Sequence, residues 1–247
     1  MKVSRWELNA GIILVVMMVC LYGLHFLVFK DVRGEGFLIV NDLAFLPIQI
    51  LLVSLVLERL LNERQKQERM EKLNMIIGVF FSEVGTKLLT YLSDHDPNLE
   101  TIKGDLVVGK DWTEEEFNKT SNKLKGYKYG IDIEKIDMEQ LRCFLLSKRD
   151  FMLRLSENPN LLEHETFTEL LRAAFHLTEE FGQRGILSGI PPKDREHLAG
   201  DVKRIYGLIV LEWISYMNHL RQNYPYMFSF AMRTNPFDRK ASATICE

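Results

Sequence analysis

The chain has 247 residues, of which 47% are hydrophobic and 26% are charged, a balance typical of folded and not of disordered proteins. Its formal net charge is −3, which gives no support to nucleic-acid binding. Two long apolar runs lie near the N-terminus. They argue against a freely soluble protein, and they are too few for a large polytopic transporter.

The first apolar run, Ala10–Phe29, carries only Cys20, Tyr22 and His25 as ionisable side chains. A helix of this length crosses a bilayer core of about 30 Å. The run is longer than the apolar region of a typical signal peptide, and no small-residue cleavage site follows it. We therefore predict an uncleaved membrane span at about residues 8–29.

The second apolar run, Phe37–Leu57, carries one formal charge, Asp42. It is joined to the first by the short segment Lys30–Gly36, in which Gly34 and Gly36 supply turn freedom. Two spans joined so closely form an antiparallel hairpin. The sequence thus predicts a two-span transmembrane hairpin over residues 1–57.

Basic residues on either side of the spans predict the orientation of the hairpin. Lys2 and Arg5 precede the first span, and only Lys30 and Arg33 lie between the two. A larger group follows the second span: Arg59, Arg64, Lys66, Arg69 and Lys72. The positive-inside rule therefore places both termini in the cytoplasm, with the protein in the cell (inner or plasma) membrane.

Residues 58–72 form the polar link to the rest of the chain. Between Asn62 and Arg69 there is no apolar residue, and neither proline nor glycine interrupts the link. We expect the second span to continue through it as a helical stalk. A basic lipid-binding patch is a weaker interpretation, because acidic residues alternate with the basic ones.

Residues 73–234 are predicted to form a cytosolic α-helical domain, which makes the whole chain mainly α. Its first helix carries an apolar stripe. The stripe consists of Leu73, Ile77, Phe80, Val84, Leu88 and Tyr91. We favour packing of this stripe within the chain over packing on the same helix of a sister chain. Gly78 and Gly85, seven residues apart, permit close approach of another helix.

Further helices follow from capping and periodicity. Thr113-x-x-Glu116 predicts a capping box at the start of a short helix, and Thr166-x-x-Glu169 caps or prolongs a later one. Segment 94–112 is irregular, and residues 235–247 form a flexible tail. The other expected helices are Asp137–Ser156, Pro192–Arg221, which is apolar enough to be central, and a short final one over Tyr224–Met232.

The polar residues of the second span are the candidate functional site. A carboxylate in hydrocarbon is costly, so Asp42 needs compensation. One reading is an acidic ring at the outer mouth of a pore made by several copies, with Asn41 beside it and Gln49 two turns along the same face. The alternatives are that Asn41 and Asp42 cap the helix, or that Asp42 pairs with Arg33 or Lys30.

Few other residues are candidates for a chemical role. His25 lies near the outer end of the first span and is a candidate pH-sensing partner of Asp42, although an interfacial histidine is the simpler reading. His176 and Glu180 are four residues apart, but no metal-binding or nucleotide-binding motif occurs. We interpret Glu212 as an acid of the core whose hydrogen-bonding needs are met within the protein. We therefore expect no catalytic residues, no metal, no cofactor and no enzymatic activity.

These observations predict a homo-oligomeric membrane protein. Its leading specific function is a cation-preferring pore lined by the second span and gated or assembled by the cytosolic domain. The alternative is a membrane-tethered scaffold or sensor whose helical domain binds protein partners. The expected partners are therefore the lipid bilayer, other copies of the chain, and a cytosolic protein.

Overall fold

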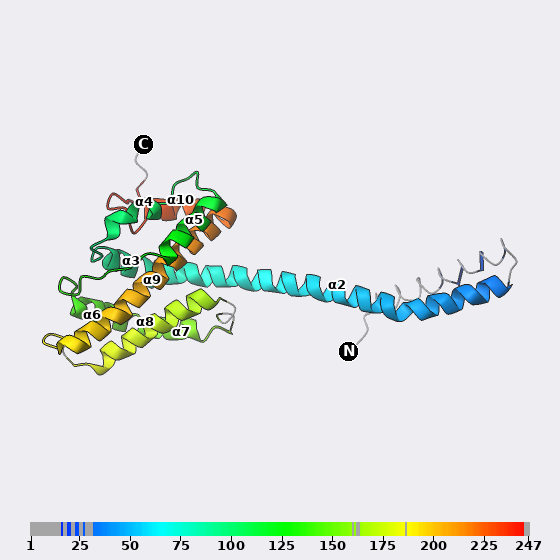
Figure 1. The fold of residues 1–247 in the computed structure, drawn as a ribbon, viewed down its shortest axis with the longest axis horizontal. Coiled ribbons are helices and arrows are strands. Elements are labelled where there is room, and N and C mark those ends of the chain that lie inside the picture. The colour runs from blue at the N-terminus through cyan, green and yellow to red at the C-terminus, as the bar shows by residue number, and fades with distance from the viewer. Residues whose placement is uncertain are drawn as a thin grey trace. The chain divides into compact units, whose positions relative to one another are not determined.

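The computed structural model describes residues 16, 19–20, 23–24, 27, 32–159, 161, 164–185 and 187–244 (Figure 1). The chain is 76% helical, and its described residues contain no strand, which confirms the mainly α fold. It divides into two compact units, Met1–Gln65 and Lys66–Glu247.

The first unit is helical wherever it is described. Residues 16, 19, 20, 23, 24 and 27 are helical, and helix α2 (Val32–Phe80) begins in this unit. Large aliphatic side chains of α2 in this unit are 46–60% exposed. They are Leu46, Ile50, Leu51, Leu52, Val53, Leu55, Val56, Leu57, Leu60 and Leu61. Because several are consecutive, they surround the helix and do not form one stripe.

The start of α2 differs from the expected loop. The helix already begins at Val32, so that Gly34 and Gly36 are helical residues and not a turn. Glycine inside a helix costs only about 1 kcal/mol relative to alanine, which the rest of a long helix overcomes. A Cβ added at Gly36 would meet no atom within 4 Å, so no close packing requires glycine there.

One helical stretch in the described part of the chain, Gln49–Ser93, is long and apolar enough to cross a membrane by length and composition. Within it, 44% of the 18-residue window that meets this criterion is buried inside the protein. Partial burial of this kind is also found in the core helix of a folded domain. The described residues therefore contain one candidate span, and the two-span hairpin remains a prediction.

The second unit is a helical domain built around helix α9 (Pro192–Asn223). After α2 come a π-helical turn η1 (Phe81–Gly85), α3 (Thr86–Ser93), η2 (Leu99–Thr101), α4 (Lys103–Leu106) and α5 (Glu114–Lys125). Then follow α6 (Met138–Ser147), α7 (Arg149–Ser156), α8 (Glu165–Gln183), α9 (Pro192–Asn223) and α10 (Pro225–Arg233). Helix α9 packs against α3, α5, α8 and α10, which confirms the expected central helix (Figure 1).

The apolar stripe predicted after the stalk lies in this core. Leu73, Ile77, Phe80, Val84 and Leu88 are each at most 1% exposed, and Tyr91 is half-buried against them. Packing within the chain, the favoured alternative, is therefore confirmed. The stripe continues across α2, η1 and α3. The π-helical turn shifts the helical register between α2 and α3, and the apolar side chains on both sides of it are still buried.

Local helix boundaries agree with the sequence at some points and differ at others. The capping box is confirmed, because Thr113 Oγ1 accepts from Glu116 N and Glu116 Oε2 accepts from Thr113 N. The helix expected over Asp137–Ser156 is two helices that meet at Lys148. Lys148 Nζ lies 2.8 Å from Glu83 Oε2, a contact between distant segments that no local pattern encodes.

The segment expected as a tail begins inside the domain. Asn235 and Phe237 are 1% and 2% exposed, respectively. Asn235 Nδ2 donates to the carbonyl oxygen of Leu106 at 3.0 Å, and its Oδ1 accepts from Phe237 N at 2.9 Å. The amide thus ties the chain after α10 to the end of α4.

Candidate functional site

An apolar recess lies in the helical domain, where α2, α9 and α10 meet. It consists of two adjoining cavities of about 380 and 390 Å³, and we call it the α9–α10 groove. The residues common to both cavities are Gly78, Ser82, Tyr216, Leu220, Tyr226 and Met227. Because the cavities share these walls, the groove is one continuous site.

The π-helical turn shapes the first wall of the groove. Phe81, its first residue, stacks on Tyr216 with ring centroids 5.1 Å apart and an angle of 16° between the rings. Phe81 also meets Trp213 edge-on at 5.2 Å. A π-helical turn inside an α-helix is rare and frequent at functional sites. Here it aims an aromatic side chain at α9 and leaves Ser82 and Thr86 on the cavity wall.

Gly78 explains how closely α2 approaches α9. A Cβ added at this glycine would lie 2.9 Å from the hydroxyl oxygen of Tyr216, closer than real Cβ contacts. The phenol ring of Tyr216 therefore lies directly over α2, and only glycine leaves space for it. Gly85, the other glycine of the predicted pair, instead faces Phe80 and Phe81 of its own chain segment.

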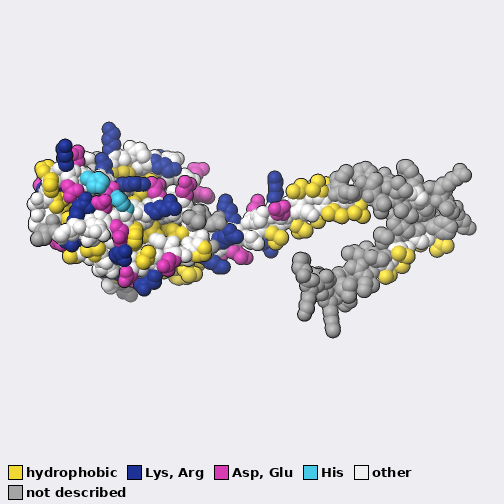
Figure 2. Space-filling view, turned by 90° about the horizontal axis from the view of Figure 1, so that it is seen from below, with side chains coloured by type: hydrophobic (Ala, Val, Ile, Leu, Met, Phe, Trp, Pro, Cys, Tyr) yellow, Lys and Arg dark blue, Asp and Glu magenta, His cyan; other side chains and the backbone are white. Residues whose placement is uncertain are grey.

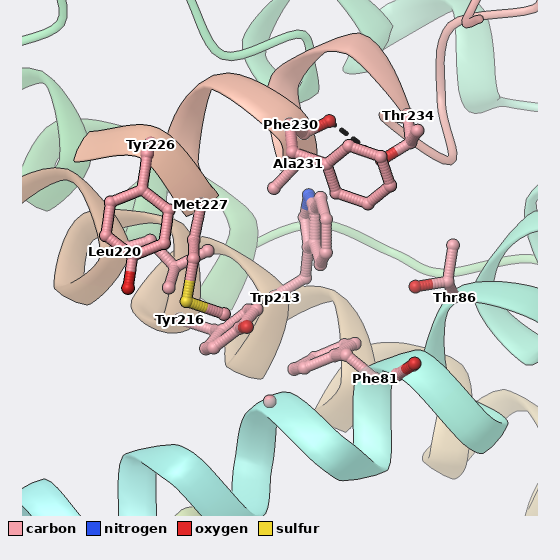
Figure 3. A pocket seen from close by; sticks show the side chains of 12 residues that line it. Phe81, Thr86, Trp213, Tyr216, Leu220, Tyr226, Met227, Phe230, Ala231 and Thr234 are labelled. Atoms are coloured by element: carbon pink, nitrogen blue, oxygen red, sulfur yellow. Dashed lines mark hydrogen bonds between the residues drawn. The ribbon is translucent and has the colours of Figure 1, made fainter. Parts of the chain in front are cut away.

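Helix α10 forms the opposite wall. Its start is fixed by the backbone N–H of Tyr224, which donates to the carbonyl oxygen of Leu220 at 2.8 Å, and by Pro225 in the first turn. Phe228 and Ala231 are buried against the core. Tyr226 and Met227 line one part of the cavity, and Phe230 and Thr234 line another, as Figure 3 shows.

The border of the groove is apolar and exposed. Met75 is 70% exposed, Val79 46%, Tyr226 73%, Met227 40% and Phe230 52%. The residues lining either cavity include no Asp, Glu, Lys or Arg. A cluster of large apolar side chains around a concave, uncharged recess is typical of a binding site.

Two hydrogen-bonding groups in the groove lack partners. Trp213 is 2% exposed, and its Nε1 makes no hydrogen bond within the protein. His219 Nε2 is likewise buried without a partner, while its Nδ1 lies 3.1 Å from Asn223 Nδ2. Burial lowers the pKa of His219 and raises that of Tyr216, so both are neutral at pH 7. The groove therefore offers polar contacts without charge.

Glu212, one turn before Tyr216 on α9, forms a polar cluster with Thr166 and His164. Its side chain is 2% exposed, Thr166 Oγ1 donates to Oε2 at 3.0 Å, and His164 Nε2 lies 3.6 Å from Oε1. Burial raises the pKa of Glu212 to about 7 and lowers that of His164. Of the two alternatives predicted for Thr166, capping the helix is wrong, because His164 occupies the cap position and accepts from Phe167 N. Thr166 is instead the second residue of α8, which agrees with the alternative that it prolongs the helix.

The residues predicted as a pore site lie in the first unit. Asp42 and Gln49 are both exposed and lie two turns apart on α2. Asn41 lies in the same helix, but its side chain is outside the described part, as is His25. The alternative in which Asn41 and Asp42 cap the helix is wrong, because α2 begins ten residues earlier at Val32. Lys30 and the side chain of Arg33 lie outside the described residues.

The groove itself was not predicted from sequence. Its individual signals were present: Gly78 on the predicted helix, the Trp213 and Tyr216 stripe, and the apolar segment at Tyr224–Met232. Their convergence depends on how α10 folds back, which the sequence pattern does not show. Within the described residues, no group of three or more His, Cys, Asp or Glu side chains could hold a metal ion.

The fold and groove define a class of protein: an all-helical chain with an apolar N-terminal helical region and a larger helical domain that carries an apolar groove. Residues 69–233 match the family described as "Uncharacterized protein MJ1433, C-terminal helical domain", and residues 2–61 match "MJ1433, N-terminal helical domain". The chain belongs to this MJ1433 family. The structural boundary at residues 65 and 66 falls between the two matched regions.

A relative in Methanocaldococcus jannaschii, the protein MJ1433 itself, is similar over the whole length. The two sequences are 42% identical over 241 residues, which cover 98% of this chain and 97% of the relative. No solved structure gives a significant match to the chain. The similarity therefore extends to both units.

Proposed function

We propose that this protein is a membrane-anchored adaptor: its apolar N-terminal helices lie in the bilayer, and its helical domain binds an amphipathic helix of a protein partner. The single observation that carries the proposal is the α9–α10 groove. This function corresponds to the tethered scaffold that the sequence suggests as an alternative. It needs no catalytic residue.

The anchor is supported by the exposure of α2 in the first unit. A surface helix of a soluble domain carries apolar residues along one stripe. Between Leu46 and Leu61, aliphatic side chains are instead exposed on every side of the helix. Lipid is an environment that accepts such a surface at all angles, and the apolar run Phe37–Leu57 has the length of a span.

The shape and chemistry of the groove favour a helix as its occupant. The two adjoining cavities form one recess lined mainly by apolar side chains, and a partner helix presents apolar anchors three, four and seven residues apart to such a recess. Met75 and Met227 border it, and methionine side chains adapt to differently shaped partners. Trp213 Nε1 supplies one unpaired donor for an acceptor on the incoming segment.

A lipid surface fits the same site less well. Peripheral membrane sites combine protruding apolar side chains with Lys or Arg that attract anionic headgroups. The α9–α10 groove is concave, and its lining has no basic residue. A helix with an uncharged apolar face fits these properties better than a bilayer does.

The proposal is tested by binding of a synthetic amphipathic helix to the full-length chain in detergent. The probe carries Leu and Phe at helical spacing on one face and a fluorophore at one end. Met227→Glu places a charge in the groove, and a charge buried against apolar anchors is costly. We expect at least about tenfold weaker binding, equivalent to about 1.4 kcal/mol, by fluorescence anisotropy.

Leu153→Glu is the matched control, because Leu153 on α7 has the same 40% exposure as Met227 and lies outside the groove. Its affinity for the probe should equal that of the wild type. Equal loss in both variants, or no loss in Met227→Glu, would show that the probe adheres elsewhere and that the groove does not bind it.

A cation-preferring homo-oligomeric pore is the second candidate function. It is favoured by one observation: Asp42 and Gln49 are exposed two turns apart on α2, and the residues between them are apolar. Polar side chains repeated every seven residues share one helix face, as a pore-lining face requires.

The two functions separate in reconstituted bilayers. For a pore, Asp42→Asn should reduce cation preference or conductance, because the ring loses its negative charge. The mass of the detergent-solubilised chain should also correspond to several copies. A monomer without currents would remove the pore and leave the adaptor proposal intact.

A further inference from the structure

Two buried nitrogen atoms of the α9–α10 groove, Trp213 Nε1 and His219 Nε2, make no hydrogen bond to any described part of the protein. Trp213 lines one of the two cavities of the groove, and His219 lines the other. A buried polar group without a partner is costly, and such groups are rare in folded proteins. Two of them in one groove point to an occupant that supplies their partners.

Asn223 determines which nitrogen of His219 carries the hydrogen. Its side-chain Nδ2 lies 3.0 Å from the carbonyl oxygen of His219 and 3.1 Å from His219 Nδ1. A carbonyl oxygen only accepts, so the amide nitrogen of Asn223 is the donor in both contacts. His219 Nδ1 therefore accepts, and the hydrogen of the neutral ring is on Nε2. Burial lowers the pKa of His219 and so favours this neutral form.

The indole nitrogen of Trp213 is also a donor, because Nε1 carries a hydrogen and has no acceptor capacity. Figure 3 shows this nitrogen at the end of the indole ring that faces α10, beside Phe230. Phe230 lines the same cavity and is 52% exposed. Exposed side chains change rotamer within nanoseconds. An incoming group therefore reaches the covered nitrogen by displacing the Phe230 ring.

The charge of the groove restricts the kind of acceptor that it can take. Acidic and basic side chains are scattered over the face of the helical domain in Figure 2, yet none lines either cavity. A carboxylate brought into the groove is buried without a cation, which is costly. Lysine and arginine supply only donors and leave both N–H groups unpaired. The side-chain amide of Asn or Gln supplies an uncharged acceptor.

We infer that Trp213 and His219 are specificity-determining residues of the groove, which selects a partner helix with Gln or Asn side chains among its apolar anchors. This inference rests on the proposed adaptor function. The two donors are six residues apart on α9, about 9 Å along the helix axis. Partner residues seven positions apart share one helix face and lie about 10.5 Å apart. Two amides at this spacing therefore match the two donors.

Binding of a series of probe peptides to the full-length chain in detergent tests this inference. The parent probe is the fluorescent helix with Leu and Phe anchors, and each member of the series carries Gln in place of one anchor. Every Gln probe buries less apolar surface than the parent. At least one should nevertheless bind the wild-type chain as tightly as the parent or more tightly, because its amide oxygen accepts from a donor of the groove.

Trp213→Phe removes the indole N–H and keeps an aromatic ring in the groove. In this variant the best Gln probe should lose about fivefold to tenfold in affinity relative to the parent probe, as expected for one hydrogen bond between neutral groups. His219→Phe should have the same effect on a second Gln probe. Trp112→Phe is the matched control, because Trp112 packs on Phe117 outside the groove. It should leave the ratio of the two affinities unchanged.

A spectroscopic measurement keeps the inference testable if Trp213→Phe does not fold. The chain has three tryptophans, so ¹⁵N labelling gives three indole N–H signals. Trp6→Phe and Trp112→Phe identify two of them and leave the third to Trp213. The best Gln probe should move the Trp213 proton signal downfield, as a new hydrogen bond does, and the parent probe should move it less.

The parent probe separates this inference from the adaptor function. If neither the parent nor any Gln probe binds, the adaptor function fails and the inference fails with it. If the parent binds but every Gln probe is weakened equally in the wild type and in Trp213→Phe, the groove still binds a helix and the inference alone is overturned. A Trp213 indole signal that bound Gln probes leave in place has the same meaning.

Discussion

Glu212 shows how a single buried side chain couples this fold to pH. The carboxyl group is 2% exposed, and its Oε1 has no hydrogen-bond donor, whereas Oε2 accepts from Thr166. Burial disfavours the charged form and raises the pKa from 4.5 to about 7. The core acid predicted from the sequence is therefore hydrogen-bonded at only one of its two carboxylate oxygens.

The direction of the pH effect follows from this raised pKa. The folded state binds the Glu212 proton more tightly than the unfolded state does. Its stabilising contribution is present in full below pH 4.5 and is lost as the pH rises through about 7. His164, 3.6 Å away, acts in the opposite direction, because burial lowers its pKa and its protonation at lower pH favours unfolding.

We predict that Glu212→Gln stabilises the protein relative to the wild type as the pH rises from 5 to 8. The difference should approach about 3 kcal/mol, the free energy that corresponds to the raised pKa. Thermal unfolding of the full chain in detergent over this pH range measures it. Parallel stability profiles of the two proteins would show that Glu212 titrates normally in the folded state.

At the level of elements, the contact between α2 and α9 depends on one glycine. Helix propensity favours alanine over glycine by about 1 kcal/mol inside a helix. At Gly78 this gain is opposed by overlap with Tyr216, which cannot rotate freely because it stacks on Phe81 and is 7% exposed. Overpacking of a buried contact costs about 1–3 kcal/mol.

The comparison of Gly78→Ala with Gly200→Ala tests this contact. Gly200 is an exposed residue inside α9, and an added Cβ would meet no atom within 4 Å. We expect Gly200→Ala to stabilise the protein by about 0.5–1 kcal/mol and Gly78→Ala to destabilise it by about 1 kcal/mol. Thermal unfolding gives both values; stabilisation by both substitutions would contradict the close approach of Tyr216.

Several elements could be predicted because their signals are local. The capping box at Thr113 needs two side chains three residues apart, and the stripe from Leu73 to Leu88 needs only periodicity. The break at Lys148 and the π-helical turn at Phe81 have no such signal. Neither contains proline, and both are stabilised by contacts with distant segments, such as the pair of Lys148 and Glu83.

At the scale of the whole molecule, the sequence does not predict recesses that several helices form together. The α9–α10 groove depends on the return of α10 toward Gly78. Periodicity predicts which residues are buried, whereas recesses arise from the angles between helices.

The proposed adaptor function depends on the α9–α10 groove as the place where a partner helix binds. Hydrogen–deuterium exchange of the full-length chain in lipid nanodiscs, with and without the amphipathic probe peptide, tests this directly. Bound peptide is predicted to slow backbone exchange in residues 74–86 and 213–234, because helices covered by a partner open less often. Protection confined to other helices, or exchange unchanged at saturating peptide, would contradict the proposed adaptor function.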